Sequence, residues 1–409
     1  MAEQITLKEY EFLYYKESPF NDDKAHKISK SSFLELEQFV LAYEESSNYL
    51  KLSSNKRFGK ILQTQNYVGV IQTQDGTTIE ILPKIESVTT QDSKAILLKM
   101  LKNLKKSPFK HFNTANLKAT KLPLLEIFIS MFLEELALLV RKGIRSGYIQ
   151  KEENLHFLKG KLKLSEQLKR NTVHKERFYV EYEEFSNNRV ENQLIKTTLE
   201  YLYKKSHSSK NQQKIREYLF VFDEVSSTHT PKEDFKKIQT SRETKAYESV
   251  LLYAKTFLLE NSFSPYKGSD VAFALLFDMN ILFESYVGAY LKKKCKDVRL
   301  QDKGKHLIDS HKKFALRPDI VLYKDTEKEI IADTKYKNIT SQKDISQADM
   351  YQLYAYGTKY QNTSQLYLIY PKNRDTFKQR YSFVKDKLHL EILFFDLSQG
   401  FEQDIGLKI

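Results

Sequence analysis

LRPDIVL at residues 316–322 and IIADTKY at residues 330–336 decide the fold of the C-terminal part of this chain. Each stretch has a short apolar run, and the polar residues 324–328 between the two runs predict a turn. Two strands joined by a turn bring Asp319 and Asp333 close together. Because alternate residues of a strand share a face, Asp333 and Lys335 are predicted to project together, with Thr334 directed the other way.

Two carboxylates and a lysine at neighbouring strand ends suit one kind of chemistry. Carboxylates hold hard cations such as Mg²⁺, which polarise a phosphate and acidify a bound water. A lysine ammonium orients that water or stabilises the developing negative charge. The pattern therefore predicts a metal-dependent phosphodiester hydrolase with Asp319 and Asp333 as metal ligands and Lys335 as the catalytic cation.

Pro318-Asp319, a spacer and Asp333-x-Lys335 resemble the PD-(D/E)xK nuclease signature. Gln352 and Tyr356, on a predicted helix after the second strand, resemble the Gln-x-x-x-Tyr element of RecB-like members. The resemblance implies that both residues support the site or the DNA backbone. Glu284, on the preceding predicted helix, occupies the place where many such nucleases carry a further metal-facing carboxylate.

Length and charge are consistent with a nuclease. The chain has 409 residues, enough for two or three domains, and its 66 Lys+Arg exceed its 53 Asp+Glu, which gives a net charge of +13. This excess favours a polyanionic partner, either nucleic acid or an acidic membrane surface. The most apolar stretch, 122–140, is interrupted by three glutamates and predicts a buried helix rather than a membrane span.

The first residues lack a signal-peptide pattern, and the single Cys295 excludes an internal disulfide and a cysteine-based zinc cluster. A cytoplasmic location is therefore expected. The apolar spacing also predicts helices at 31–43 and 93–104. Strands at 67–72 and 77–82 flank an Asp-Gly turn, which predicts a hairpin. This N-terminal region is interpreted as a small mixed domain, either a DNA-binding module or a docking module.

The middle region is predicted to be mainly helical, with a β-like finger. Residues 155–164 and 177–182 are expected to form extended arms around 165–175, and an apolar helix follows from Val190 to Leu202. The predicted tip of the finger is basic, and either phosphates or a protein partner suit it. Its charged residues are Lys169, Arg170, His174, Lys175 and Arg177.

Several further segments resemble the McrC family, the nuclease subunit of McrBC-type restriction systems that act on 5-methylcytosine DNA in phage defence. The resemblance covers roughly residues 120–395. It is carried by LKGKL (158–162), YEEFSNNRVEN (182–192), LIK (194–196), LRPD (316–319), DTKY (333–336) and YQL (351–353). It implies that Asp319, Asp333 and Lys335 are catalytic. It also implies that the middle region is a finger domain, which inserts into the ring of an AAA+ GTPase partner and stimulates GTP hydrolysis.

The sequence contains no Gly-x-x-x-x-Gly-Lys-Ser/Thr loop and no His/Cys zinc constellation. GTP is therefore expected to be bound by the McrB-like AAA+ GTPase ring and not by this chain. The expected cofactor is Mg²⁺, with Mn²⁺ as a substitute. The expected partners are double-stranded DNA and the GTPase ring, and no membrane.

These observations predict an α+β protein of three regions: an N-terminal mixed α/β domain (1–108), a largely helical domain with a partner-binding finger (109–265) and a C-terminal α/β PD-(D/E)xK endonuclease domain (266–409). The predicted function is DNA cleavage as the Mg²⁺-dependent subunit of a GTP-dependent McrBC-like complex, a type IV-like restriction endonuclease. Two alternatives stay open: a stand-alone RecB-like repair nuclease, and a non-enzymatic activator of a GTPase ring.

Overall fold

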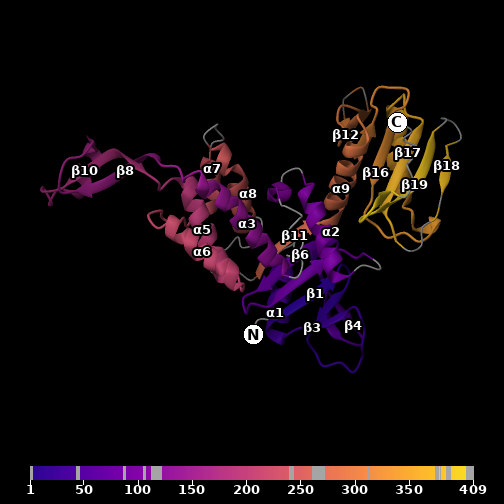
Figure 1. The fold of residues 1–409 in the computed structure, drawn as a ribbon, viewed down its shortest axis with the longest axis horizontal. Coiled ribbons are helices and arrows are strands. Elements are labelled where there is room, and N and C mark those ends of the chain that lie inside the picture. The colour runs from indigo at the N-terminus through magenta and orange to yellow at the C-terminus, as the bar shows by residue number, and fades with distance from the viewer. Residues whose placement is uncertain are drawn as a thin grey trace. The chain divides into compact units, whose positions relative to one another are not determined.

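In the computed structural model of the chain, the described residues are 3–42, 47–85, 89–104, 107–111, 122–238, 244–259, 272–308, 310, 313–373, 377, 379–383 and 388–401. The chain divides into two compact units (Figure 1). One unit combines the two ends of the chain, residues 1–124 and 263–409, and the other contains residues 125–262. The predicted boundary at 265–266 lies outside the described residues, and the division into three domains stays a prediction.

The N-terminal part of the first unit contains two four-stranded sheets. The first has the order β1 (Gln4–Lys8), β7 (Thr78–Leu82), β6 (Tyr67–Thr73), β11 (Ala272–Asp278), and the second has the order β3 (Ala25–Lys27), β2 (Phe12–Tyr14), β5 (Gly59–Thr64), β4 (Leu50–Asn55). The predicted hairpin is confirmed as β6 and β7, and Gly76 in its turn has a φ of +88°. The predicted helices are confirmed as α1 (Lys30–Ala42) and α2 (Thr90–Lys102), with a short 3₁₀ helix, η2 (Pro108–His111), after them.

Strand β11 completes the first sheet although it follows the middle region in the sequence. It pairs antiparallel with β6, where Leu276 lies opposite Gly69. Gly69 has a φ of +141°, and a Cβ atom built at this residue would lie 2.0 Å from the Leu275 carbonyl oxygen. Only glycine permits this approach of the two backbones. Asp278 ends β11 and caps the next helix, because its side chain accepts a hydrogen bond from Asn280 N.

The second unit is helical and carries a long β-hairpin. Its helices are α3 (Leu124–Arg141), α5 (Val190–Lys205), α6 (Ser209–Val221), α7 (Pro231–Lys237) and α8 (Glu248–Leu258), with η4 (Lys245–Tyr247) before the last. Strands β8 (Gly147–Leu155) and β10 (Phe178–Ser186) pair antiparallel along nine residues each and extend away from these helices (Figure 1). We call residues 147–186 the finger. None of the described helices is long and apolar enough to cross a lipid bilayer.

The first arm of the finger lies earlier in the sequence than predicted. The first arm is β8, whereas the predicted arm, residues 155–164, contains the last residue of β8 and the two-residue strand β9 (Lys161–Leu162). The predicted loop 165–175 begins with a helix, α4 (Leu164–Arg170). Gly160 accounts for the interruption: its φ is +70°, and a Cβ atom there would lie 2.4 Å from the Glu181 carbonyl oxygen.

The C-terminal part of the first unit is a mixed sheet covered by two helices. The strand order is β12 (Val298–Leu300), β15 (Ile320–Leu322), β16 (Ile330–Thr334), β17 (Gln365–Pro371), β19 (His389–Asp396), β18 (Arg380–Ser382), and β20 (Gly400–Phe401) also pairs with β19. Strands β15 and β16 are antiparallel, as predicted, whereas β16, β17 and β19 are parallel. The helices are α9 (Met279–Lys294) and α10 (Gln347–Lys359), and η5 (Gln342–Asp344) precedes α10.

Helices α9 and α10 cover opposite faces of this sheet. Phe394 and Phe395 are consecutive residues of β19, so their side chains point to opposite faces. Phe394 packs against the core cluster that includes Leu353 of α10, and Phe395 contacts Phe283 and other aromatic side chains of α9. The chain therefore has a mixed α+β fold with several sheets, and its largest sheet lies between two helices.

Candidate active site

The antiparallel pair of β15 and β16 brings the two predicted metal ligands together. Ile320 lies opposite Ala332, so Asp319, which precedes Ile320, lies beside Asp333. The Asp319 carboxylate is half-buried, and its Oδ2 accepts hydrogen bonds from the backbone N and the hydroxyl of Thr334, each at 2.8 Å. These two bonds fix the orientation of Asp319 toward the end of β16.

Asp333 is buried, with a side-chain exposure of 2%. Burial is the main cause that raises the pKa of its carboxyl group to about 7, and the negative charge of Asp319 adds to this effect. The Lys335 ammonium acts in the opposite direction, since Nζ lies 2.7 Å from Asp333 Oδ2. The two neighbouring carboxylates repel each other, so an additional positive charge between them would stabilise the ionised form of both.

Lys335 is held by three side chains. Besides the ion pair with Asp333, its Nζ donates a hydrogen bond of 3.0 Å to Gln352 Oε1 and lies 3.9 Å from Asp349 Oδ1. Burial acts to lower the pKa of Lys335, but the charges of Asp333 and Asp349 outweigh burial and raise it. The ammonium therefore keeps its positive charge at neutral pH.

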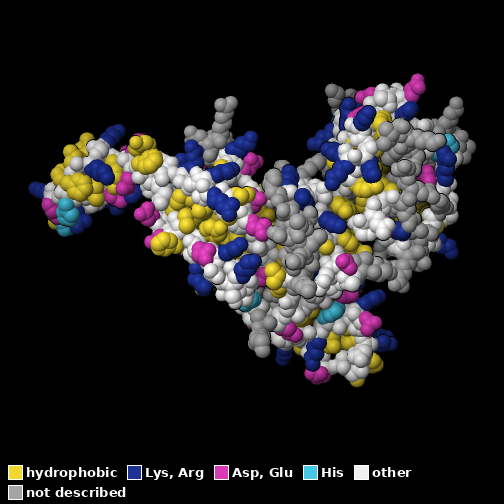
Figure 2. Space-filling view, viewed as in Figure 1, with side chains coloured by type: hydrophobic (Ala, Val, Ile, Leu, Met, Phe, Trp, Pro, Cys, Tyr) yellow, Lys and Arg dark blue, Asp and Glu magenta, His cyan; other side chains and the backbone are white. Residues whose placement is uncertain are grey.

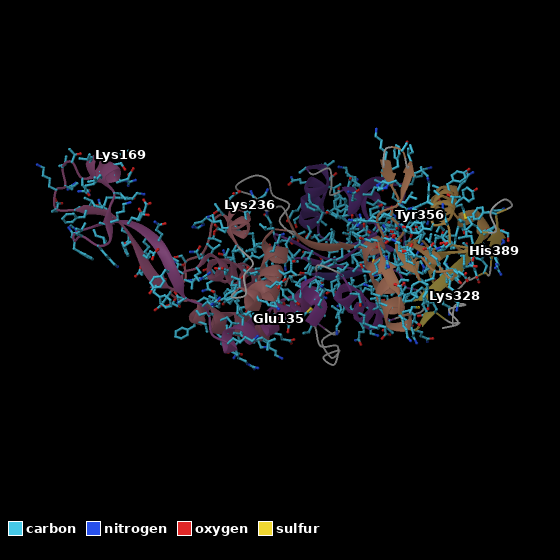
Figure 3. All side chains as sticks on the ribbon, turned by 90° about the horizontal axis from the view of Figure 1, so that it is seen from above. Glu135, Lys169, Lys236, Lys328, Tyr356 and His389 are labelled. Atoms are coloured by element: carbon cyan, nitrogen blue, oxygen red, sulfur yellow. The ribbon has the colours of Figure 1, made fainter. Side chains whose placement is uncertain are left out.

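The predicted Gln-x-x-x-Tyr element meets this lysine from α10. Gln352 Nε2 donates a hydrogen bond of 2.7 Å to Tyr356 Oη, because residues four apart share one face of a helix. Tyr356, which is labelled in Figure 3 among the side chains of the C-terminal sheet and its helices, in turn donates to the Arg317 carbonyl oxygen at 3.3 Å. A chain of hydrogen bonds thus runs from Lys335 to the residue two before Asp319.

Two residues of the site were missed by the sequence reasoning. Thr334 was assigned to the opposite face of the strand, yet its hydroxyl binds Asp319. Asp349 was not considered, although it lies three residues before Gln352 and so falls on the same face of α10. It is buried and lies 3.1 Å from Lys337 Nζ as well as near Lys335. Helical spacing from Gln352 is the signal that would have found Asp349.

Glu284 makes a different contact. Its Oε1 accepts a hydrogen bond of 2.8 Å from Gln301 Nε2, and the Gln301 backbone N donates to the Asp319 carbonyl oxygen at 2.7 Å. Glu284 is thereby connected to Asp319 through Gln301. Among the residues that the structure describes, no three His, Cys, Asp or Glu side chains form a group that could hold a metal ion.

The pair of aspartates nevertheless suits a hard cation. Asp333 Oδ2 is buried and receives no hydrogen bond of good geometry from the described residues, although Lys335 Nζ is near. In the structure the Lys335 ammonium is the cation that compensates this buried oxygen. Oxygen ligands from one or two carboxylates, completed by water and substrate phosphate, are typical of magnesium sites.

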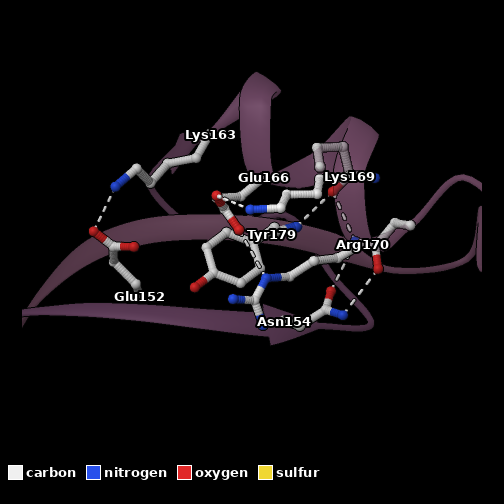
Figure 4. A network of polar contacts seen from close by, with 9 residues as sticks. Glu152, Asn154, Lys163, Glu166, Lys169, Arg170 and Tyr179 are labelled. Carbon is white, nitrogen blue, oxygen red and sulfur yellow. Dashed lines mark hydrogen bonds and ion pairs between the residues drawn. The ribbon is translucent and has the colours of Figure 1, made fainter.

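The tip of the finger is less basic than its composition suggests. Arg170 and Lys169 lie 2.8 and 3.9 Å from the carboxylate of Glu166 (Figure 4). His174 lies 3.3 Å from Glu176. The neighbouring apolar side chains are exposed, and Figure 2 shows hydrophobic atoms gathered on the finger. They include Phe157, Leu158, Leu164, Leu168 and Val173, each at least 60% exposed. Three of the five basic side chains thus lie beside glutamates, and together with the exposed apolar groups these pairs favour a protein partner over phosphates at this tip.

Comparisons with known proteins agree with this architecture. A chain in the refined half-complex from the tetradecameric assembly of Thermococcus gammatolerans McrB AAA+ hexamers with bound McrC aligns with a TM-score of 0.64 and 19% identity, over 96% of this chain and 94% of that chain. A chain in the cryo-EM structure of the Thermococcus gammatolerans McrBC complex aligns with a TM-score of 0.50 and 21% identity, over 71% of this chain and 87% of that chain. No curated protein matches the sequence.

The family model for the McrBC 5-methylcytosine restriction system component matches residues 62–371. This range covers 310 of the 409 residues, including β6, the finger and every residue of the candidate site. The chain belongs to the McrBC 5-methylcytosine restriction system component family.

Proposed function

We propose that this chain is the McrC-type nuclease subunit of a GTP-dependent restriction complex and that it cleaves DNA with Mg²⁺ at a PD-(D/E)xK site. One observation carries the proposal: Asp319, Asp333 and Lys335 converge at the ends of two paired strands, and Gln352 of α10 holds the lysine. This is the set of groups that phosphodiester hydrolysis needs, at one edge of a sheet covered on both faces.

Each side chain has a distinct part in this proposal. Asp319 and Asp333 hold the metal ion, with Glu284 as an auxiliary ligand candidate. When bound, Mg²⁺ supplies a Lewis acid for the phosphate and lowers the pKa of a bound water. Lys335 orients the attacking water and stabilises negative charge, while Gln352 and Tyr356 fix the direction of the lysine through the hydrogen bonds at 3.0 and 2.7 Å.

The proposed partner is an AAA+ GTPase ring that binds GTP and receives the finger. The similar solved chain comes from an assembly of McrB AAA+ hexamers with bound McrC. The exposed apolar side chains at the finger tip, such as Leu168 at 73%, supply a surface that a protein partner would bury. The ring delivers DNA, and this chain cuts it.

A cleavage assay with the chain, its AAA+ partner, GTP and Mg²⁺ tests the proposal. Asp333→Asn removes an anionic ligand, so cleavage should fall by about two orders of magnitude or more, as expected for the loss of a metal ligand. Asp325→Asn is the matched control, since Asp325 is exposed in the turn between the same strands and has a φ of +63°, which asparagine tolerates.

Three results would contradict the proposal. Wild-type cleavage by the folded Asp333→Asn protein would show that the site is elsewhere. Efficient cleavage by the chain without partner and GTP would favour a stand-alone nuclease. Stimulation of GTP hydrolysis without any DNA cleavage would favour a non-enzymatic activator.

A further inference from the structure

A two-stranded ribbon projects from the chain directly before Asp319. It consists of β13 (His306–Ile308) and β14 (Lys313–Ala315), which pair antiparallel with His306 opposite Ala315. The two strands form a sheet of their own and pair with no strand of the large sheet among the described residues. A ribbon of this kind has no role in the hydrogen bonding of the sheet beside it.

The ribbon exposes apolar side chains. Phe314 is 69% exposed, and Leu307 and Ile308 are 46% and 40% exposed. Phe314 also has a φ of +56°, a backbone conformation that bulky residues seldom adopt. A strained, exposed aromatic residue costs stability, and such positions cluster where binding or catalysis uses them.

The sequence segment that contains the ribbon is basic. Residues 303–317 contain five lysines and arginines and one acidic residue, Asp309, so their net charge is 5 − 1 = +4. The two flanking carboxylates add little to its outer surface, because Asp302 is buried against Lys324 at 2.7 Å and Asp319 belongs to the candidate site. The combination of positive charge and an exposed aromatic ring is typical of nucleic-acid contacts.

Backbone hydrogen bonds anchor the base of the ribbon to the candidate site. Gln301 N donates to the Asp319 carbonyl oxygen at 2.7 Å, and Leu316 N donates to the Lys305 carbonyl oxygen at 2.9 Å. Arg317 Nη2 adds a bond of 2.6 Å to Gln301 Oε1. These bonds fix the base of the ribbon beside Asp319.

We propose that the β13–β14 ribbon enters the major groove of the DNA duplex that this chain cleaves, with its lysines on phosphates and Phe314 against the bases. The inference rests on the proposed nuclease function and adds a DNA-contacting element to it. The major groove, about 12 Å wide, admits a two-stranded ribbon in undistorted B-DNA, whereas the minor groove, about 6 Å wide, must be widened and the duplex bent before a ribbon can enter it. An acidic protein would also suit the charge, but the anchoring to Asp319 favours DNA.

Two variants test the ribbon in the assembled complex with partner and GTP. Phe314→Ala should lower kcat/KM for duplex cleavage about tenfold, the effect of losing one good base contact. Lys303→Ala/Lys313→Ala, two exposed lysines, should lower the slope of log affinity against log salt by about two, because two phosphate contacts are lost. The matched controls are Leu41→Ala, whose side chain is 70% exposed on α1, and Lys51→Ala/Lys56→Ala on the exposed N-terminal surface.

Photocrosslinking makes the test independent of cleavage. A benzophenone amino acid at position 314, in an Asp333→Asn background, should crosslink to duplex DNA, and the same group at position 41 should not. Unchanged kcat/KM in Phe314→Ala, together with an unchanged salt slope in the double lysine variant, would contradict the proposal that the ribbon contacts DNA. Crosslinks to the AAA+ partner in place of DNA would also contradict this proposal. A wild-type complex that never cuts DNA would instead contradict the proposed nuclease function.

Discussion

Glu9 and Tyr336 are joined by a hydrogen bond of 2.9 Å from the Tyr336 hydroxyl to Glu9 Oε2. Glu9 directly follows β1, and Tyr336 directly follows Lys335, so the bond connects the N-terminal sheet to the strand end of the candidate site. Lys84 N donates to the same Glu9 oxygen at 2.9 Å, whereas Glu9 Oε1 is buried without a hydrogen bond among the described residues. Glu9 therefore accepts two hydrogen bonds at Oε2, while burial without a partner at Oε1 favours the protonated, neutral form of the carboxyl group.

The stability of the chain should depend on the protonation of Glu9. Burial is the main cause that raises its pKa from 4.5 to about 7, and the charge of Asp278 acts in the same direction. The folded state therefore binds more protons than the unfolded state between these pH values, and stability falls as pH rises from about 4.5 through 7. Glu9→Gln stays neutral and can still accept both hydrogen bonds. It should be more stable than the wild type at pH 8 by up to about 3 kcal/mol, and nearly equal to it at pH 5.

Urea unfolding of both proteins between pH 5 and 8 checks this prediction. Glu17→Gln is the control, because the Glu17 side chain is 92% exposed and forms an ion pair with exposed Lys27. A stability difference between Glu9→Gln and the wild type that does not grow with pH would show that Glu9 is not the titrating group.

Elements whose residues lie close together in the sequence could be predicted from the sequence. Apolar runs on either side of a turn predicted the hairpin of β6 and β7 and the pair of β15 and β16, because each depends on residues within about twenty positions. The resemblance to the Gln-x-x-x-Tyr element pointed to Gln352 and Tyr356 on α10. The hydroxyl of Thr334 was missed because, at the end of a strand, the Asp319 carboxylate reaches both the backbone and the side chain of its neighbour.

Non-local features could not be predicted in this way. Nothing near residue 69 indicates that β6 pairs with β11, which lies about two hundred positions later, because register between distant strands depends on the whole sheet. In the finger, the alternating lysines and leucines of 158–164 imitate a strand. The structure interrupts this pattern at Gly160, where close contact with the backbone of Glu181 demands a turn.

Gly69→Ala should destabilise the first unit. The methyl group would lie 2.0 Å from the Leu275 carbonyl oxygen, and alanine is strained at a φ of +141°. Strain alone costs about 1–3 kcal/mol, and displacement of β11 from β6 adds to this cost. Thermal unfolding should show a clear decrease in Tm. Gly143→Ala is the control for backbone strain without a clash, since its φ is +85° and nothing lies within 4 Å of the added Cβ. Equal stability of the two variants would argue against the close pairing at Gly69.

Gln352→Ala should reduce the rate of the chemical step. The Lys335 ammonium would lose its bond of 3.0 Å to Gln352, and Tyr356 would lose its donor, so the lysine would be less well oriented. Loss of a positioning group beside a metal site typically costs about 10–100-fold in activity. We expect kcat to fall while KM for DNA stays near the wild-type value. Gln347→Ala, on the exposed start of the same helix, should leave both constants unchanged. A change confined to KM would instead assign Gln352 to DNA binding.

Cleavage and activation of the GTPase should be separable. The finger and the candidate active site belong to different compact units, so Asp333→Asn should still accelerate GTP hydrolysis by the AAA+ partner. Leu168→Asp places a charge on an exposed apolar residue of the finger and should abolish this acceleration. Phosphate release measured with partner and GTP distinguishes the two variants. Loss of stimulation by a folded Asp333→Asn protein would show that the two activities depend on each other.

The last prediction concerns dependence on the partner. A net charge of +13 is expected to attract any duplex, but contacts to phosphates carry no sequence information, and the sequence contains no nucleotide-binding loop. The chain alone should therefore bind DNA weakly, release it as salt rises, and cut little even with Mg²⁺.

Addition of the AAA+ partner with GTP should restore cleavage, because the ring brings DNA to Asp319, Asp333 and Lys335. A time course that compares the chain alone, with partner, and with partner and GTP measures this dependence. Rapid cutting at defined sites by the chain alone would rule the dependence out.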